Sequence, residues 1–205
     1  MNKIESQNRI QLNLKIGAVN FMISKEEAVN ILKEEGCEEK VIRHCLLVSE
    51  VAVKLAEKNK AMGRDVDVRL TEIGGILHDL GRAQTHGMDH AIVGARLAKK
   101  HGVEKPVLDI IKKHIGAGIT PKEAFFFGLP KDDYMPRTWE EKIVAHADNM
   151  VKGTKVITLK KRNKILKEIG ADKELRQRIK DLAHEVDPDE PVDFDDENDI
   201  ENNEE

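Results

Sequence analysis

Residues 78–81 read His-Asp-Leu-Gly, and further potential metal ligands flank them at helix-sized intervals. His44 lies 34 positions before His78. Three more potential ligands follow Asp79 at successive intervals of 11, 24 and 34 residues: His90, His114 and Asp148. An imidazole inside an apolar, helix-periodic segment loses its hydration, which costs stability unless a partner compensates. One shared metal centre would compensate all of these side chains together, so this stretch indicates both a fold and a site.

The composition is typical of a soluble helical protein. Hydrophobic residues make up 40% of the 205 positions and charged residues 35%, which suits one sizeable domain with appendages. No apolar run approaches the ~18 residues that span a bilayer, and the N-terminus lacks the apolar core of a secretory signal. We therefore expect a cytoplasmic protein with no membrane partner. Cys37 and Cys45 form no Cys-x-x-Cys pair, and we interpret them as reduced, buried thiols.

The charge is distributed unevenly along the chain. Residues 185–205 contain 12 acidic residues and no Lys or Arg, so the formal net charge of −4 leaves +8 on residues 1–184. A positive body suits an anionic ligand, although an evenly basic surface is the plainer alternative. The acidic segment has too little apolar content to fold, and we predict a disordered tail at 185–205. No RNA- or DNA-binding motif is visible, so nucleic acid is an unlikely partner.

Apolar residues recur at helical spacing through most of the chain, and no strand of useful length is apparent. Ser24 and Glu27 have the spacing of a capping box, whereas residues 1–21 carry no helix start signal. Helices are expected at about 24–36, 38–60, 66–80, 89–100, 105–114, 121–127, 138–153, 160–169 and 172–184. The pattern predicts an all-α domain at 22–184, between an N-terminal extension at 1–21 and the acidic tail.

The potential ligands suit a dinuclear centre. Asp79 has two carboxylate oxygens and can bridge two ions. His44, His78 and Asp148 could complete the ligands of one ion. His90 and His114 could complete those of the other. Mixed His and carboxylate ligation favours iron or manganese, with cobalt, nickel, zinc or magnesium as alternatives. Considered alone, each histidine has an alternative to a metal-binding role. His44 could be an ordinary core histidine, and His114 could cap the end of a helix.

The ordered set resembles the HD-domain superfamily of metal-dependent phosphohydrolases. Leu80-Gly81 is similar to the Ile-Gly of its HDIG subgroup, and residues 89–95, DHAIVGA, are similar to its His-Ala-x-x-Gly-Ala element. Ala147-Asp148 resembles its closing Ala-Asp. The resemblance covers about 38–152 and is strongest to small archaeal and bacterial proteins with six ligands and two metals. It implies a helical bundle with a five-helix catalytic core, extra C-terminal helices here, and Asp79 as the bridging ligand.

Substrate contacts are expected around this centre. Arg82 follows the His-Asp-Leu-Gly stretch directly, and its guanidinium could grip a phosphate or simply face helix-terminal carbonyls. His86 could contact substrate or the second metal, and Lys112 could line the phosphate entrance. We assign catalysis to Asp79 and Arg82, and substrate binding to Arg82, His86 and Lys112. The remaining histidines, His101, His146 and His184, are expected outside the ligand set, with His101 exposed at a helix end.

Five of the seven aromatic residues fall within 125–139, a segment punctuated by Gly and Pro. Such segments often carry function. One ring could stack on a nucleobase or pterin, although packing of Phe125, Phe126 and Phe127 onto the core is the interpretation that we favour from sequence.

The predicted function is hydrolysis of a small nucleotide-like phosphomonoester or phosphodiester by a metal-bound hydroxide. Two alternatives stay open. The same six-ligand pattern resembles mixed-valent di-iron oxygenases of the HD fold, which cleave C–C or C–P bonds with O₂. A non-catalytic nucleotide-binding regulatory module is the other alternative, although degenerate modules of that kind usually lose ligands. A homodimer is also left open.

Overall fold

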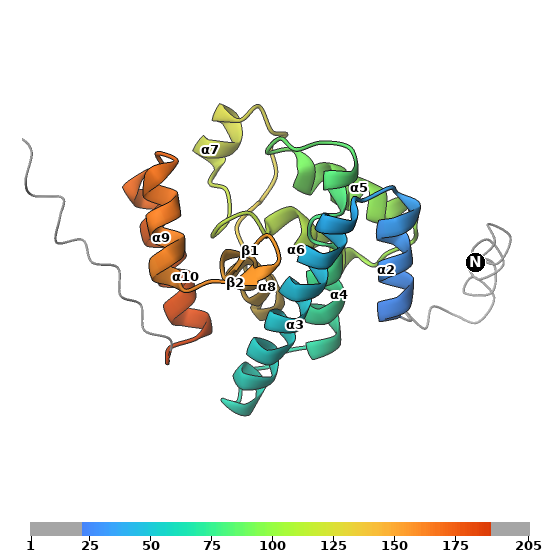
Figure 1. Cartoon of the computed structure of the whole chain (residues 1–205), viewed down its shortest axis with the longest axis horizontal. Coiled ribbons are helices and arrows are strands. Elements are labelled where there is room, and N and C mark those ends of the chain that lie inside the picture. Colours follow the sequence, from blue (N-terminus) through green and yellow to red (C-terminus); the bar gives the residue numbers. More distant parts are fainter. Residues whose placement is uncertain (1–21, 190–205) are drawn as a thin grey trace, which may run out of the picture.

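The computed structural model describes residues 22–189, which are helical apart from one short β-hairpin (Figure 1). The elements are α2 (Lys25–Glu34), α3 (Glu39–Ala61), α4 (Val68–Leu77), the 3₁₀ helix η1 (Leu80–Ala83), α5 (His90–Lys100), α6 (Lys105–Lys113), α7 (Pro121–Phe126), α8 (Trp139–Asn149), β1 (Val151–Lys152), β2 (Lys155–Val156), α9 (Leu159–Glu168) and α10 (Lys173–Val186). The predicted all-α class is confirmed. None of the helices within this range is both long and apolar enough to cross a bilayer.

Local sequence signals set several helix starts. The predicted capping box at Ser24 forms, and Thr138 starts α8 in the same way: each accepts a hydrogen bond from the backbone N–H of a glutamate three residues later. That glutamate's side chain accepts one from the cap's own N–H in return, which satisfies two N–H groups that a helix end leaves open. A third capping box, at Thr120, starts α7.

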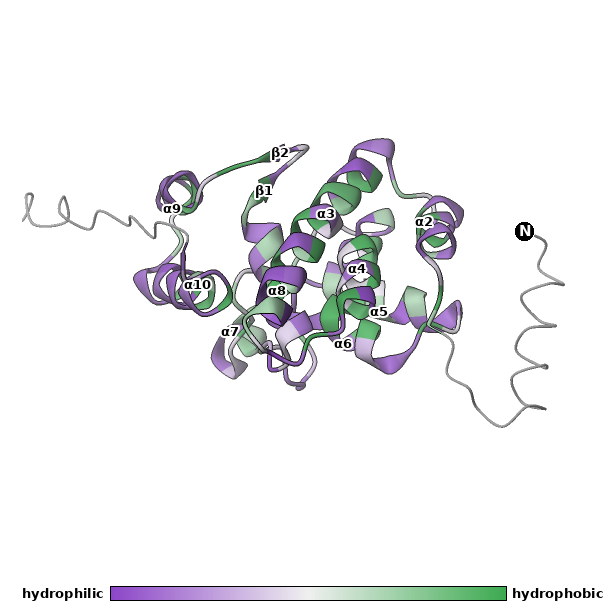
Figure 2. Ribbon diagram, turned by 90° about the horizontal axis from the view of Figure 1, so that it is seen from below, coloured by the Kyte–Doolittle hydropathy of each residue, from purple (hydrophilic) through white to green (hydrophobic). Residues whose placement is uncertain are grey.

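Five helices, α3, α4, α5, α6 and α8, pack on one another and form the expected five-helix core. Their apolar faces turn inward, as the hydropathy colouring in Figure 2 shows. Helix α4 approaches α3 and α6 closely at two glycines, where no side chain separates the helices. A Cβ at Gly75 would lie 2.8 Å from the Cα of Ser49 on α3, and one at Gly74 would lie 2.6 Å from Cδ1 of Ile110 on α6. Helix α2 flanks one end of this core, and α9 with α10 flanks the other (Figure 1).

The structure corrects two expected helix ends. The helix expected to run to residue 80 ends at Leu77, because Asp79 leaves the helical conformation with φ −101° and ψ 17°. The helix expected to run to residue 153 ends at Asn149, and Gly153, with φ 61°, lies between the two strands of the hairpin. Both breaks fall beside potential metal ligands.

The C-terminal helix is longer than expected, since α10 ends at Val186 and not at residue 184. The first residues assigned to the acidic tail are therefore held: Glu185 pairs with Lys142 at 2.5 Å, and Asp187 pairs with Lys58. The rest of that segment, 190–205, and the N-terminal extension at 1–21 lie outside the described residues. The domain boundaries stay predictions.

Candidate metal centre

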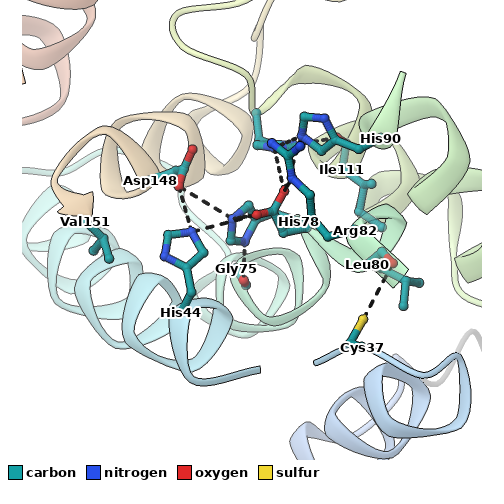
Figure 3. A network of polar contacts seen from close by, with 12 residues as sticks. Cys37, His44, Gly75, His78, Leu80, Arg82, His90, Ile111, Asp148 and Val151 are labelled. Atoms are coloured by element: carbon teal, nitrogen blue, oxygen red, sulfur yellow. Dashed lines mark hydrogen bonds and ion pairs between the residues drawn. The ribbon is translucent and has the colours of Figure 1, made fainter. Parts of the chain in front are cut away.

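Six side chains from five segments converge at the middle of the core (Figure 3). The first, His44, comes from the N-terminal half of α3. The others sit at or beside helix ends: His78 and His114 are the C-caps of α4 and α6, His90 begins α5, Asp79 precedes η1 and Asp148 is in the last turn of α8. Figure 3 shows His44, His78 and Asp148 pointing toward one another. Ends of helices suit this purpose because a side chain there can turn along the helix axis into the shared space.

Asp79 lies between two pairs of imidazoles. Its Oδ2 atom is 3.9 Å from Nε2 of His44 and 3.8 Å from Nε2 of His78. Its Oδ1 atom is 3.2 Å from Nε2 of His90 and 3.6 Å from Nε2 of His114. Each carboxylate oxygen thus faces its own pair, which is the arrangement that a bridging ligand requires.

Asp148 completes the first half of the cluster. Its Oδ1 atom lies 3.0 Å from Nε2 of His44 and 3.6 Å from Nε2 of His78. The carboxylate therefore faces the same pair of imidazoles as Oδ2 of Asp79. Three overlapping groups of potential ligands result: His44 and His78 with Asp79, His90 and His114 with Asp79, and His78 and His114 with Asp148.

All four imidazoles are oriented in the same way. The Nδ1 atom of each lies 2.7–2.8 Å from a backbone carbonyl oxygen: His44 with Gly153, His78 with Gly75, His90 with Gly87 and His114 with Ile111. An N–H at Nδ1 donates to that carbonyl and leaves the Nε2 lone pair directed inward. This backbone support is the usual setting of a histidine that binds a metal ion.

The inward lone pairs fit cations. Nε2 of His78 is buried and has no hydrogen-bond partner among the described residues. Nε2 of His90 lies 3.1 Å from Nε2 of His114, so two acceptors face each other when both Nδ1 atoms carry the proton. A divalent cation would satisfy these atoms together, since imidazole nitrogen and carboxylate oxygen are its common ligands. The donor set therefore fits divalent metal ions.

The electrostatics of the cluster favour ionised carboxylates. Burial raises the pKa of Asp79, but the facing histidines, His78 first, outweigh it and hold this pKa well below its usual range. The pKa of Asp148 is lowered in the same way by His44 and His78. Burial lowers the pKa of His78, yet the two carboxylates raise it to about 9, whereas burial keeps that of His114 below its usual value. Negative charge is thus concentrated on the two carboxylates.

The structure places one of the three predicted substrate residues at the cluster. Nε of Arg82 donates to Oδ1 of Asp79 at 3.2 Å, and its Nη1 donates to the carbonyl of His86 at 2.8 Å. His86 contributes this carbonyl while its side chain is exposed. Lys112 pairs with Asp132 at 2.5 Å. Among the described residues, neither the amine of Lys112 nor the imidazole of His86 contacts the six-residue cluster.

Arg162 is a residue that sequence reasoning missed. From α9 it donates to three backbone carbonyls, two at the end of α8 and one in β1: Asn149 at 2.6 Å, Asp148 at 3.0 Å and Val151 at 2.7 Å. Nothing in the sequence distinguishes it from the other basic residues of α9. Its partners exist only because the chain reverses direction at the hairpin.

The histidines expected outside the ligand set lie in different surroundings. His101 was expected to be exposed, but its side chain is only 23% exposed and Nε2 lies 2.7 Å from Oε1 of Glu35 on α2. His146 is fully buried, and His184 is exposed. None of the three belongs to a potential ligand group in the described part of the chain.

The two cysteines lie beneath the cluster and are free thiols, both buried as predicted. Sγ of Cys37 contacts the carbonyl oxygen of Leu80 at 3.7 Å. Burial, reinforced by the charge of Asp79, raises the pKa of Cys37 to about 11 and raises that of Cys45 as well. Both thiols stay protonated near neutrality, which makes them poor metal ligands.

Comparison with known proteins decides the family. Residues 41–152, more than half of the chain, match the HD domain. The chain belongs to the HD domain family. The predicted family is therefore confirmed, and the match begins within α3, which carries His44, and ends in β1, just after α8, which carries Asp148.

Individual relatives share the domain to different extents. The uncharacterized protein MJ0778 of Methanocaldococcus jannaschii is 51% identical over 134 residues, 65% of this chain and 79% of that protein. A tRNA (cytidine(56)-2'-O)-methyltransferase of Picrophilus torridus is 42% identical over 142 residues, 69% of this chain but only 40% of the methyltransferase. The crystal structure of the Listeria monocytogenes phosphodiesterase PgpH HD domain matches 78% of this chain and 94% of that chain, with a TM-score of 0.48 and 20% identity. This last likeness concerns the fold alone.

Proposed function

We propose that the chain is a metal-dependent phosphohydrolase that acts on a nucleotide-like phosphate ester. The observation that carries the proposal is Asp79, whose two oxygens each face a separate pair of imidazole Nε2 atoms. A site that holds two cations about 4 Å apart suits the displacement of an ester oxygen from phosphorus. Membership of the HD domain family supports the same reaction class.

The donor set assigns the ligands of each ion. His44, His78 and Asp148 would hold one, His90 and His114 would hold the other, and Asp79 would contribute one oxygen to each. Bound divalent cations supply Lewis-acid chemistry, which polarises a phosphoryl oxygen and makes water a better nucleophile. Four imidazoles with two carboxylates favour iron or manganese over magnesium, which prefers oxygen ligands.

Arg82 would hold the substrate's phosphate. Its described contacts, to Asp79 and to the carbonyl of His86, use Nε and Nη1 and fix the guanidinium beside the cluster. The other N–H groups can donate to phosphate oxygens, for which a planar guanidinium is well shaped. The guanidinium would therefore orient the phosphorus and offset charge on its oxygens.

A second candidate substrate class is RNA that carries a susceptible phosphate. The relative from Picrophilus torridus is named as a tRNA methyltransferase, and this chain matches 40% of it. An HD domain joined to such an enzyme would encounter RNA, so RNA ends belong among the compounds to be tested, although no nucleic-acid-binding motif was found in the sequence.

The deciding experiment is a hydrolysis screen, with all products separated by chromatography, on protein freed of metal by a chelator and reloaded with Mn²⁺ or Fe²⁺ without oxygen. The panel holds mononucleotides, cyclic nucleotides, dinucleoside polyphosphates and RNA oligonucleotides with terminal phosphates. We expect metal-dependent hydrolysis under anaerobic conditions. Turnover that requires O₂ would support the oxygenase alternative, and ligand binding without turnover in any metal state would support the regulatory module.

A further inference from the structure

Several large apolar side chains remain exposed on one side of the molecule. Phe125 is 88% exposed, Phe126 83% and Ile169 72%. The residue of α7 that is buried is instead Ala124, so the favoured expectation that the phenylalanines pack onto the core is wrong for Phe125 and Phe126. Exposed rings gathered at one place usually mark a site of interaction.

These side chains line a cavity of about 800 Å³. Its walls come from the loop at 115–120, helix α7 and the turn between α9 and α10 with the start of α10, and Met88 from the loop before α5 also lines it. Ile119 and Leu175 give it apolar walls deeper in the molecule, whereas Glu123 is engaged by Arg178 at 2.5 Å. Cavities of about 300–1,000 Å³ with mostly apolar walls are typical of small-molecule sites.

The cavity adjoins the candidate metal centre through the chain itself. Ile115 directly follows His114, and Met88 lies two residues before His90. The carbonyl of Gly116 accepts a hydrogen bond of 2.7 Å from Nδ2 of Asn149, the residue after Asp148. Two lining residues, Ile115 and Met88, thus lie one and two positions along the chain from candidate ligands, although none of the six candidate ligands itself lines the cavity.

Glycine makes this close arrangement feasible. Gly116 has φ 60°, which allows the chain to turn immediately after His114. A Cβ there would lie 3.4 Å from Cδ1 of Leu175, so the loop and α10 are already in close contact. The turn between α9 and α10, which closes the cavity, lies outside residues 41–152 that match the HD domain.

We propose that this cavity binds the planar aromatic part of the substrate, with the chemistry of a nucleobase, while the attached phosphate lies at the metal centre. The proposal rests on the proposed function and specifies its substrate class. Exposed phenylalanine rings at the mouth offer faces on which a heterocycle stacks, and apolar walls accept it without requiring a charged partner. The base would enter between α7 and the α9–α10 turn.

The test compares two ligands that differ by the base alone: the 5'-monophosphate of 2-aminopurine riboside and ribose 5-phosphate. Binding of the first is followed by its fluorescence on metal-free protein, and turnover of both is measured on Mn²⁺-loaded protein. The double variant Phe125→Ala/Phe126→Ala should weaken binding and raise KM for the nucleotide about tenfold, because one stacked base is worth about that factor. KM for ribose 5-phosphate should not change.

The matched control is Met62→Ala, which removes another apolar side chain that is 43% exposed but lies at the end of α3, outside the cavity. It should behave as the wild type with both ligands. Absence of nucleotide binding by the wild type, or an equal effect of the double variant on both ligands, would overturn the proposal. So would a dimer that the double variant dissociates, since a second copy would then cover the rings. Nucleotide binding without turnover would instead count against the proposed function alone.

Discussion

Nε2 of His90 lies 3.1 Å from Nε2 of His114, while Nδ1 of each ring is held by a backbone carbonyl. Two acceptors that face each other inside a protein destabilise it unless a proton or cation lies between them. We therefore expect Mn²⁺ or Fe²⁺ to stabilise the folded state strongly. At a thousandfold excess over Kd the gain is about 4 kcal/mol, which raises Tm by about 10 °C in a chain of this size.

Scanning calorimetry of chelator-treated protein, with and without each metal, measures this shift. Calcium is the control ion, because it prefers an all-oxygen site with more ligands. A Tm that responds to no transition metal, or that rises equally with Ca²⁺, would show that the cluster is not a metal centre.

The two carboxylates should differ in how many ions they hold. Asp79 pairs with imidazoles on both sides, whereas the ion pairs of Asp148 with imidazoles in the described part of the chain are those to His44 and His78. Asp79→Ala should therefore lose both ions and all turnover, and Asp148→Ala should keep one ion. Elemental analysis of the purified variants gives the metal content directly. Asp132→Ala, which removes a carboxylate paired with Lys112 outside the cluster, is the control and should keep two ions.

Sequence alone could predict the family, and it picked out the six residues that converge in the structure, because chemistry restricts both strongly. Imidazoles are rare within apolar helices, and the His-Asp pair, with His90 and Asp148 in the right order, indicated one site before any coordinates. The end of α4 at Leu77 was not predictable in the same way. Nothing in local propensity breaks the helix there, whereas η1, which follows the break, packs closely against α5 in the folded chain.

The surroundings of the site depend on tertiary structure and escaped prediction. Arg162 acts through carbonyls brought near it by the hairpin, and the direction of the phenylalanines of α7 depends on which side of that helix meets the core. Lys112, predicted to meet substrate, meets Asp132 because the loop after α7 folds back over α6. Side-chain chemistry is visible in sequence, whereas the neighbours of a long side chain are not.

Arg82 is expected to act on substrate and not on metal loading. Replacement by alanine removes its contacts with Asp79 and the carbonyl of His86, but leaves all six candidate ligands. Arg82→Ala should keep two ions and lower kcat/KM about 100-fold, a typical loss when a charged group on the reacting phosphate is removed. Arg82→Lys should recover part of it, since an amine offers charge without the planar fork. Steady-state kinetics with parallel metal analysis separate these effects, and unchanged kinetics would refute the assignment.

Gly81 permits the contact between η1 and α5 that sets the position of His90. A Cβ at this residue would lie 1.9 Å from the carbonyl oxygen of His90 and 2.7 Å from the backbone nitrogen of Gly94. Backbone atoms cannot rotate away, so Gly81→Ala must push α5 off η1. We expect a loss of about 3 kcal/mol or more in the free energy of unfolding, measured by urea denaturation.

The control for this prediction is Gly36→Ala. Gly36 has φ 83° but open space around it, so the variant incurs only conformational strain of about 1 kcal/mol. Equal losses in the two variants would mean that the contact between η1 and α5 does not depend on the absence of a side chain at Gly81.

Arg162 should strengthen binding of one ion more than the other. Its three hydrogen bonds fix the segment after Asp148, and the same segment supplies the carbonyl of Gly153 that orients His44. Asp148 and His44 both belong to the half of the cluster that also contains His78. Arg162→Ala should therefore weaken the ion on that side about 10- to 100-fold, the usual effect of removing a group that orients a metal ligand. The ion between His90 and His114 should bind as before.

Calorimetric titration of the metal-free protein with Mn²⁺ resolves the two steps. Arg64→Ala is the matched control, because Arg64 also donates to a backbone carbonyl, that of Glu185 at 2.8 Å, but far from the ligands. Both variants should lose about 2 kcal/mol in the free energy of unfolding from their missing hydrogen bonds. Only Arg162→Ala should change metal affinity. If both lose stability and neither loses affinity, then Arg162 merely caps α8, and the position of Asp148 is set by the helix itself.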